Sequence, residues 1–82
     1  MPHIAVNLYP GRDGQTKREI AEKTERFFAT TFGFADNEVS VSIVELAPDE
    51  FVPTIQDRYP GEELFVASRY ITADGHGDSS AS

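Results

Sequence analysis

The fold of this chain is decided by the stretch HIAVNLY at residues 3–9. Apolar residues alternate in it, so that Ile4, Val6 and Leu8 would point to one face and the residues between them to the other. A period of two with β-branched side chains predicts a β-strand. Pro10-Gly11 follows at once and is expected to end this strand.

A long amphipathic helix is predicted after this strand, from about Gly14 to Phe32. Asp13 suits the N-cap position, because its carboxylate can accept a hydrogen bond from the first turn. Gly33 is the natural residue to end the helix, since glycine adopts the left-handed conformation at little cost. Helical spacing puts one set of apolar and threonine residues on a single face, namely Ile20, Thr24, Phe27, Phe28 and Thr31.

A second strand is predicted over residues 39–46, VSVSIVEL. Strand, helix and strand in this order predict a βαβ unit with parallel strands and a right-handed crossover, so the fold class is α/β (α+β). Two strands are not stable alone in water. We therefore expect oligomerisation to complete the fold, as a homo-oligomer with a dimer favoured and a trimer or hexamer as alternatives.

The remainder of the chain carries weaker patterns. A short helix is expected over residues 48–57, followed by a turn at Pro60-Gly61. Residues 64–71 are apolar enough for a short extended arm. The last residues, 73–82, lack an apolar anchor, and disorder is expected there. These patterns predict one domain over residues 1–72.

Composition narrows the possible partners. The formal net charge of −7 argues against nucleic acid. The chain has no cysteine, and His3 and His76 lack the spacing of metal ligands, so no metal is expected. No apolar run approaches the roughly 18 residues of a membrane span, and no signal peptide is visible. The expectation is a cytoplasmic protein that binds neither nucleic acid nor membrane.

Pro2 is the residue with the clearest chemical potential. A small second residue normally permits removal of Met1, and removal would expose the Pro2 nitrogen as a free secondary amine. The predicted strand would carry this amine on a rigid element. Such an amine can serve as a general base without a histidine and without a cofactor.

Several motifs together resemble the 4-oxalocrotonate tautomerase superfamily, over roughly residues 2–51. They are Pro2-His3-Ile4, Gly11-Arg12 after the first strand, the long helix, and Val39-Ser40-Val41-Ser42-Ile43 leading to Glu45-Leu46 and Phe51. The opening residues and the Ser-Val-Ser-Ile core look most similar to the small dimeric tautomerases active on phenylpyruvate. The resemblance implies a tautomerase domain over residues 1–72. Its implied activity is a cofactor-free isomerase that interconverts the enol and keto forms of a 2-oxo acid.

The resemblance also implies roles for individual residues. Pro2 matches the catalytic base, Arg12 the arginine that binds the substrate carboxylate, and Phe51 the aromatic wall of the pocket. Ser40 is a candidate substrate-binding residue at the position where the diacid-isomerising enzymes carry a second arginine. This difference favours a monocarboxylate enol such as phenylenolpyruvate. Tyr9 is a further candidate for lining the pocket.

Each residue also has a plainer interpretation. Arg12 could be a solvated arginine in a turn, and Phe51 a core or interface residue. His3 should point away from the base and have a structural or interfacial role. A second cation could instead come from Arg58 or Arg69 of a neighbouring subunit.

Two other functions stay open. A protonated Pro2 could act as an acid that hydrates or dehalogenates a small unsaturated acid on the same fold. Alternatively, the protein could be a non-catalytic oligomeric subunit. If Met1 is retained, the Pro2 nitrogen is an amide and cannot be a base, so the state of the N-terminus discriminates between these hypotheses.

Overall fold

The computed structural model describes residues 1–35 and 37–73. It begins with the predicted βαβ unit, in which strand β1 spans His3–Leu8, helix α1 spans Gly14–Phe32 and strand β2 spans Ser40–Glu45. The α/β class is thereby confirmed. The bounds of α1 agree with the prediction, and the strand ends differ from it by a single residue.

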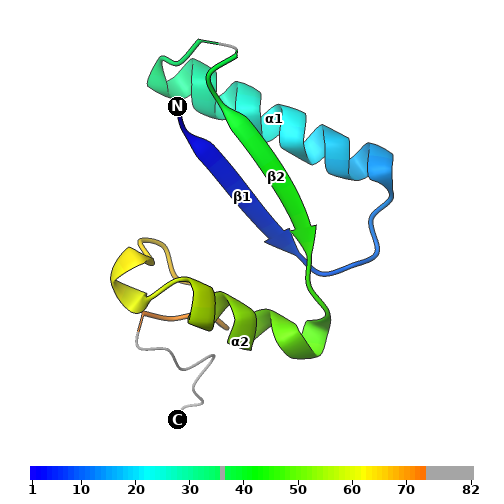
Figure 1. Cartoon of the computed structure of the whole chain (residues 1–82), viewed down its shortest axis with the longest axis vertical. Coiled ribbons are helices and arrows are strands. Elements are labelled where there is room, and N and C mark those ends of the chain that lie inside the picture. The colour runs from blue at the N-terminus through cyan, green and yellow to red at the C-terminus, as the bar shows by residue number, and fades with distance from the viewer. Residues whose placement is uncertain (36, 74–82) are drawn as a thin grey trace. The chain divides into compact units, whose positions relative to one another are not determined.

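The two strands lie side by side and run in the same direction (Figure 1). Their register runs from His3 opposite Ser40 to Leu8 opposite Glu45. The predicted parallel pairing is therefore confirmed. It follows that the start of β1 and the start of β2 lie at one end of the sheet, and the carboxyl ends of both strands lie at the other.

Both ends of α1 are capped by the residues that the sequence indicates. Asp13 Oδ1 accepts a hydrogen bond from the Thr16 N–H at 2.8 Å. Gly33 has the left-handed backbone angles φ 82° and ψ 32°. Its N–H and that of Phe34 both donate to the Ala29 carbonyl at 2.9 Å. This is a Schellman-type ending, in which two donors satisfy a carbonyl that the helix leaves open.

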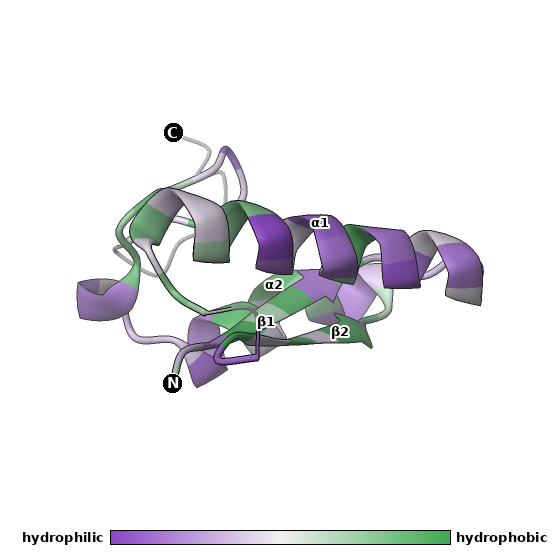
Figure 2. Ribbon diagram, turned by 90° about the horizontal axis from the view of Figure 1, so that it is seen from above, coloured by the Kyte–Doolittle hydropathy of each residue, from purple (hydrophilic) through white to green (hydrophobic). Residues whose placement is uncertain are grey.

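α1 packs chiefly on β2, on one side of the sheet (Figures 1 and 2). Ile43 of β2 lies beside the amino-terminal half of α1, and Lys17 of α1 forms a 3.7 Å ion pair with Glu45. Because side chains alternate along a strand, Ile43 and Glu45 face α1, whereas Ser40 and Ser42 face away from it. The sheet therefore has a helix-covered face and a second face that α1 does not cover.

The apolar core of this unit is small. Among the described residues only Ala29 and Val39 are buried apolar residues. Two large side chains of α1 are mostly exposed, Phe27 at 65% and Phe32 at 61%. One helix on two strands thus leaves apolar surface in contact with water.

A second compact unit begins at Ala47. It contains helix α2, Pro48–Arg58, and the 3₁₀ helix η1, Gly61–Glu63. The predicted short helix is confirmed, with Pro48 at its start and acidic residues in its first turn. The division of the chain into a domain over residues 1–72 stays a prediction.

The expected extended arm over residues 64–71 is wrong in its second half. The Ser68 N–H donates to the Ile71 carbonyl at 3.0 Å, so the chain turns back there. The Ser68 hydroxyl also accepts from the Tyr70 and Ile71 N–H groups, at 3.3 and 3.2 Å. A serine hydroxyl that binds the backbone in this way stabilises a turn in place of an extended chain.

The expected disorder over residues 73–82 falls, apart from Ala73, outside the described residues. In the described part of the chain, no helix is both long enough and apolar enough to cross a bilayer. A cytoplasmic location stays a prediction from the sequence.

Candidate active site

Pro2 lies directly before β1 and is tied to the first residue of β2. Its carbonyl accepts a hydrogen bond from the Ser40 N–H at 3.2 Å. This bond suits proline, which has no N–H to donate and can join a strand ladder only through its carbonyl. Pro2 is half-buried, whereas Met1 is fully exposed. Pro2, the predicted catalytic base, is thus attached to the sheet by a backbone hydrogen bond.

His3 joins the two serines of β2 on the sheet face that α1 does not cover. Its Nδ1 lies 2.7 Å from the Ser40 Oγ, and its Nε2 lies 3.1 Å from the Ser42 Oγ. His3 and Ser40 are directly opposite in the ladder, and Ser42 is the next residue of β2 on the same face. Both ring nitrogens therefore have a hydroxyl partner, and the ring lies along β2.

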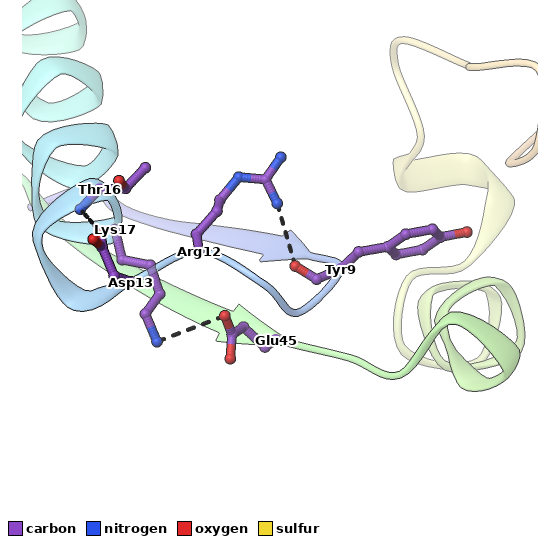
Figure 3. Close-up of polar contacts among 6 residues, drawn as sticks. All are labelled: Tyr9, Arg12, Asp13, Thr16, Lys17 and Glu45. Carbon is purple, nitrogen blue, oxygen red and sulfur yellow. Dashed lines mark hydrogen bonds and ion pairs between the residues drawn. The ribbon is translucent and has the colours of Figure 1, made fainter.

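Arg12 and Tyr9 lie at the other end of β1, in the loop that leads into α1. Arg12 Nη1 donates a hydrogen bond to the Tyr9 carbonyl at 3.3 Å (Figure 3). Between these residues, Gly11 has a φ of 125°, a value that residues with a side chain rarely adopt. The glycine therefore lets the loop turn, and the hydrogen bond holds the guanidinium beside the end of β1.

Charged side chains surround this loop (Figure 3). The Thr16 backbone N–H lowers the pKa of Asp13 below its ordinary value of 3.8, because the hydrogen bond favours the ionised carboxylate. Lys17 and Glu45 form the ion pair between α1 and β2. The cap and the ion pair hold the first turn of α1 at the carboxyl end of β2. Arg12 lies at the same end of the sheet.

The structure therefore separates two of the predicted site residues within one chain. Pro2 precedes the six-residue strand β1, and Arg12 follows it. At about 3.3 Å per residue, such a strand is roughly 20 Å long. Ser40 lies at the Pro2 end and Tyr9 at the Arg12 end. Phe51 is a half-buried residue of α2, in the second unit.

A cavity of about 340 Å³ opens between the amino-terminal half of α1 and β2. The residues around it come from both elements and are Gly14, Lys17, Arg18, Ala21, Glu22 and Ile43. Neither Pro2 nor Arg12 is among them. Within the described residues, no group of three or more histidine, aspartate or glutamate side chains is arranged to hold a metal ion.

Sequence reasoning missed the contact between His3 and the two serines. It treated His3 as a structural residue that points away from the base and Ser40 as a candidate substrate ligand. The structure pairs the Ser40 hydroxyl with His3 instead. The sequence carries no signal for this contact, because it depends on the parallel register that pairs His3 with Ser40 and puts them on the same face.

The comparison with protein families identifies the class of this chain. The model described as "Tautomerase enzyme" matches residues 2–58, so the chain belongs to the tautomerase family. The match begins at Pro2 and includes β1, α1, β2 and α2. It supports an isomerase activity of the tautomerase type. Comparisons with curated proteins and with solved structures found no match.

Proposed function

We propose that this protein is a cofactor-free tautomerase that interconverts the enol and keto forms of a 2-oxo acid such as phenylpyruvate. The observation that carries the proposal is the family match that begins at Pro2. In this mechanism the Pro2 nitrogen, freed by removal of Met1, takes the enol proton from oxygen and delivers a proton to carbon.

Enol–keto tautomerisation requires a base that is unprotonated near neutral pH and a cation that holds the carboxylate. Apolar surroundings and a nearby positive charge both disfavour a protonated amine, and a guanidinium group supplies such a charge. It also binds a carboxylate through two parallel hydrogen bonds. We assign the base to Pro2, the carboxylate anchor to Arg12, and the apolar wall to Phe51 with a contribution from Tyr9.

One protomer does not bring the base and the anchor together. The reacting carbon of a 2-oxo acid is separated from the carboxylate only by the 2-oxo carbon, whereas β1, roughly 20 Å long, separates Pro2 from Arg12. We therefore propose that Arg12 comes from a second copy of the chain. The small core and the exposed apolar side chains of α1 favour such a homo-oligomer. A dimer is favoured, and a trimer or hexamer is the alternative.

The substrate class follows from the position of Ser40. Its hydroxyl carries no charge and is bonded to His3, so it is a poor partner for a second carboxylate. We propose that the enzyme prefers a monocarboxylate enol to a diacid. Arg58 and Arg69 are the residues of a neighbouring chain that would reverse this preference.

The test compares two forms of the folded protein. One has Pro2 as its first residue, verified by intact mass, and the other has the Pro2 nitrogen blocked by a short N-terminal extension. We expect the first form to ketonise phenylenolpyruvate and the blocked form to lose nearly all of this activity. Full activity in the blocked form would exclude Pro2 as the base. A higher kcat/KM for 2-hydroxymuconate than for phenylenolpyruvate would overturn the substrate assignment alone.

A further inference from the structure

We propose that Ser40 and His3 position Pro2 for catalysis, by fastening the start of β1 to β2 on the side of the sheet away from α1. The inference rests on the proposed function, because it concerns the same base. It gives Ser40 a role other than binding the substrate, and it gives His3 a role in catalysis beyond holding the two strands together. Both residues act through Pro2 and are positioning residues.

Three hydrogen bonds converge at this point of the sheet. Ser40 donates its backbone N–H to the Pro2 carbonyl at 3.2 Å, and its hydroxyl lies 2.7 Å from His3 Nδ1. The His3 Nε2 lies 3.1 Å from the Ser42 hydroxyl. Ser40 therefore holds two consecutive residues of the chain, Pro2 through the backbone and His3 through the side chain.

Pro2 needs such a fastening more than most residues at the start of a strand. The first residues of a chain fray unless they are tied down, and a proline adds no N–H to the ladder. Once Met1 is removed, the direction of the Pro2 nitrogen depends on the backbone that follows it. A His3 ring bonded at both nitrogens restricts this backbone, because rotation of residue 3 would break two hydrogen bonds.

The hydroxyl partners make this cluster insensitive to the tautomer of His3. A serine hydroxyl can donate to one ring nitrogen or accept from it, so both contacts form with either neutral tautomer. Neither His3 nor Ser40 supplies the carboxylate anchor, which the proposed function assigns to Arg12 of a second chain. Loss of the fastening should therefore disturb the proton-transfer step and leave carboxylate binding nearly unchanged.

The experiment uses the full-length protein with Pro2 verified as the first residue. The variants are Ser40→Ala, which removes the hydroxyl, Ser40→Thr, which retains it, and His3→Phe, which keeps a ring without nitrogens. Thr30→Ala, on the exposed part of α1, is the matched control for loss of a hydroxyl. The measurements are kcat and KM for phenylenolpyruvate, and the NMR line width of a ¹⁵N-labelled Pro2 amine.

We expect Ser40→Ala and His3→Phe to lower kcat about 3- to 10-fold, the effect of one lost hydrogen bond on a rate, with KM changed less than about 2-fold. Ser40→Thr should recover most of the rate, and the control should match the wild type. The Pro2 signal should change its line width in the two impaired variants only. If one of these variants does not fold, the other gives the same comparison.

Wild-type kcat in folded Ser40→Ala or His3→Phe would overturn the positioning role. An equal loss in Ser40→Thr would do so as well, since that variant keeps the hydroxyl. The failure of the proposed function has a different signature. In that case the N-terminally blocked protein keeps full activity, whereas failure of this inference alone leaves the blocked protein inactive and the Ser40 variants fully active.

Discussion

Phe34 stacks on Phe28, with ring centroids 5.6 Å apart and ring planes 9° apart. Phe28 also contacts Phe32, with centroids at 5.0 Å. The Phe34 backbone N–H reaches back to the Ala29 carbonyl in the same turn. The aromatic contact and the hydrogen bond together stabilise the carboxyl end of α1. Both depend on the left-handed conformation of Gly33, which turns the chain back so that Phe34 reaches the last turn of the helix.

Gly33→Ala should destabilise the protein, because a Cβ opposes the left-handed conformation at φ 82°. We expect the free energy of unfolding to fall by about 1 kcal/mol, measured by urea denaturation. Gly14→Ala is the control, since its Cβ would meet open space at the first position of the helix. That variant should be neutral or slightly more stable. Equal stability of the two variants would contradict the assigned role of Gly33.

The contribution of Asp13 to the free energy of unfolding should depend on pH. Its folded-state pKa lies below the ordinary value of 3.8, so the unfolded chain binds this proton more readily. The contribution is present above pH 3.8 and is lost as the pH falls through the lowered folded-state pKa. Asp13→Asn keeps a side-chain oxygen for the Thr16 N–H and should lose less stability between pH 5 and pH 2 than the wild type.

The matched comparison for this cap is Asp13→Ala, which removes the acceptor. Its urea midpoint should be lower than that of the wild type at pH 7, and the difference should shrink as the pH is lowered. If Asp13→Asn and Asp13→Ala unfold at the same midpoint at pH 7, the hydrogen bond to Thr16 does not contribute to stability.

Arg12→Ala should weaken catalysis through substrate binding. Loss of a hydrogen bond to a charged group corresponds to about 1.5–3 kcal/mol, or roughly 10- to 150-fold in kcat/KM. KM should rise, and kcat should fall as well, because the anchor also positions the reacting carbon. Arg12→Lys should be intermediate, since an ammonium group lacks the planar fork. Arg18→Ala, a nearby cation of α1, should keep wild-type kinetics, and an equal loss there would indicate only a general effect of charge.

The βαβ unit could be predicted from the sequence because its signals are local. Alternation in residues 3–9 fixes a strand, and the two residues at the ends of α1, Asp13 and Gly33, fix a helix by their own chemistry. The turn at Ser68 escaped prediction for a physical reason. Its hydroxyl competes for backbone N–H groups, and the apolar pattern of the surrounding residues gives no sign of that competition.

The residues of the candidate site could be named from the sequence, but their contacts could not. The strand predicted over residues 3–9 already separates Pro2 from Arg12 within one chain. The contact of His3 with Ser40 depends on the register of two strands that are distant in sequence. Register is a property of the pairing, so it becomes visible only once the fold is known.

The separation of Pro2 from Arg12 along β1 leads to a test of the shared site by mixing two defective proteins. One has a blocked Pro2 nitrogen, and the other carries Arg12→Ala. If each site takes Pro2 from one chain and Arg12 from its partner, a mixed dimer has one intact site and one doubly defective site. Random exchange makes about half of the dimers mixed, so activity should return to roughly a quarter of the wild-type value. Each protein alone, refolded in the same way, is the control. No recovery in verified mixed oligomers would mean that both residues act within one chain, which would contradict the shared site.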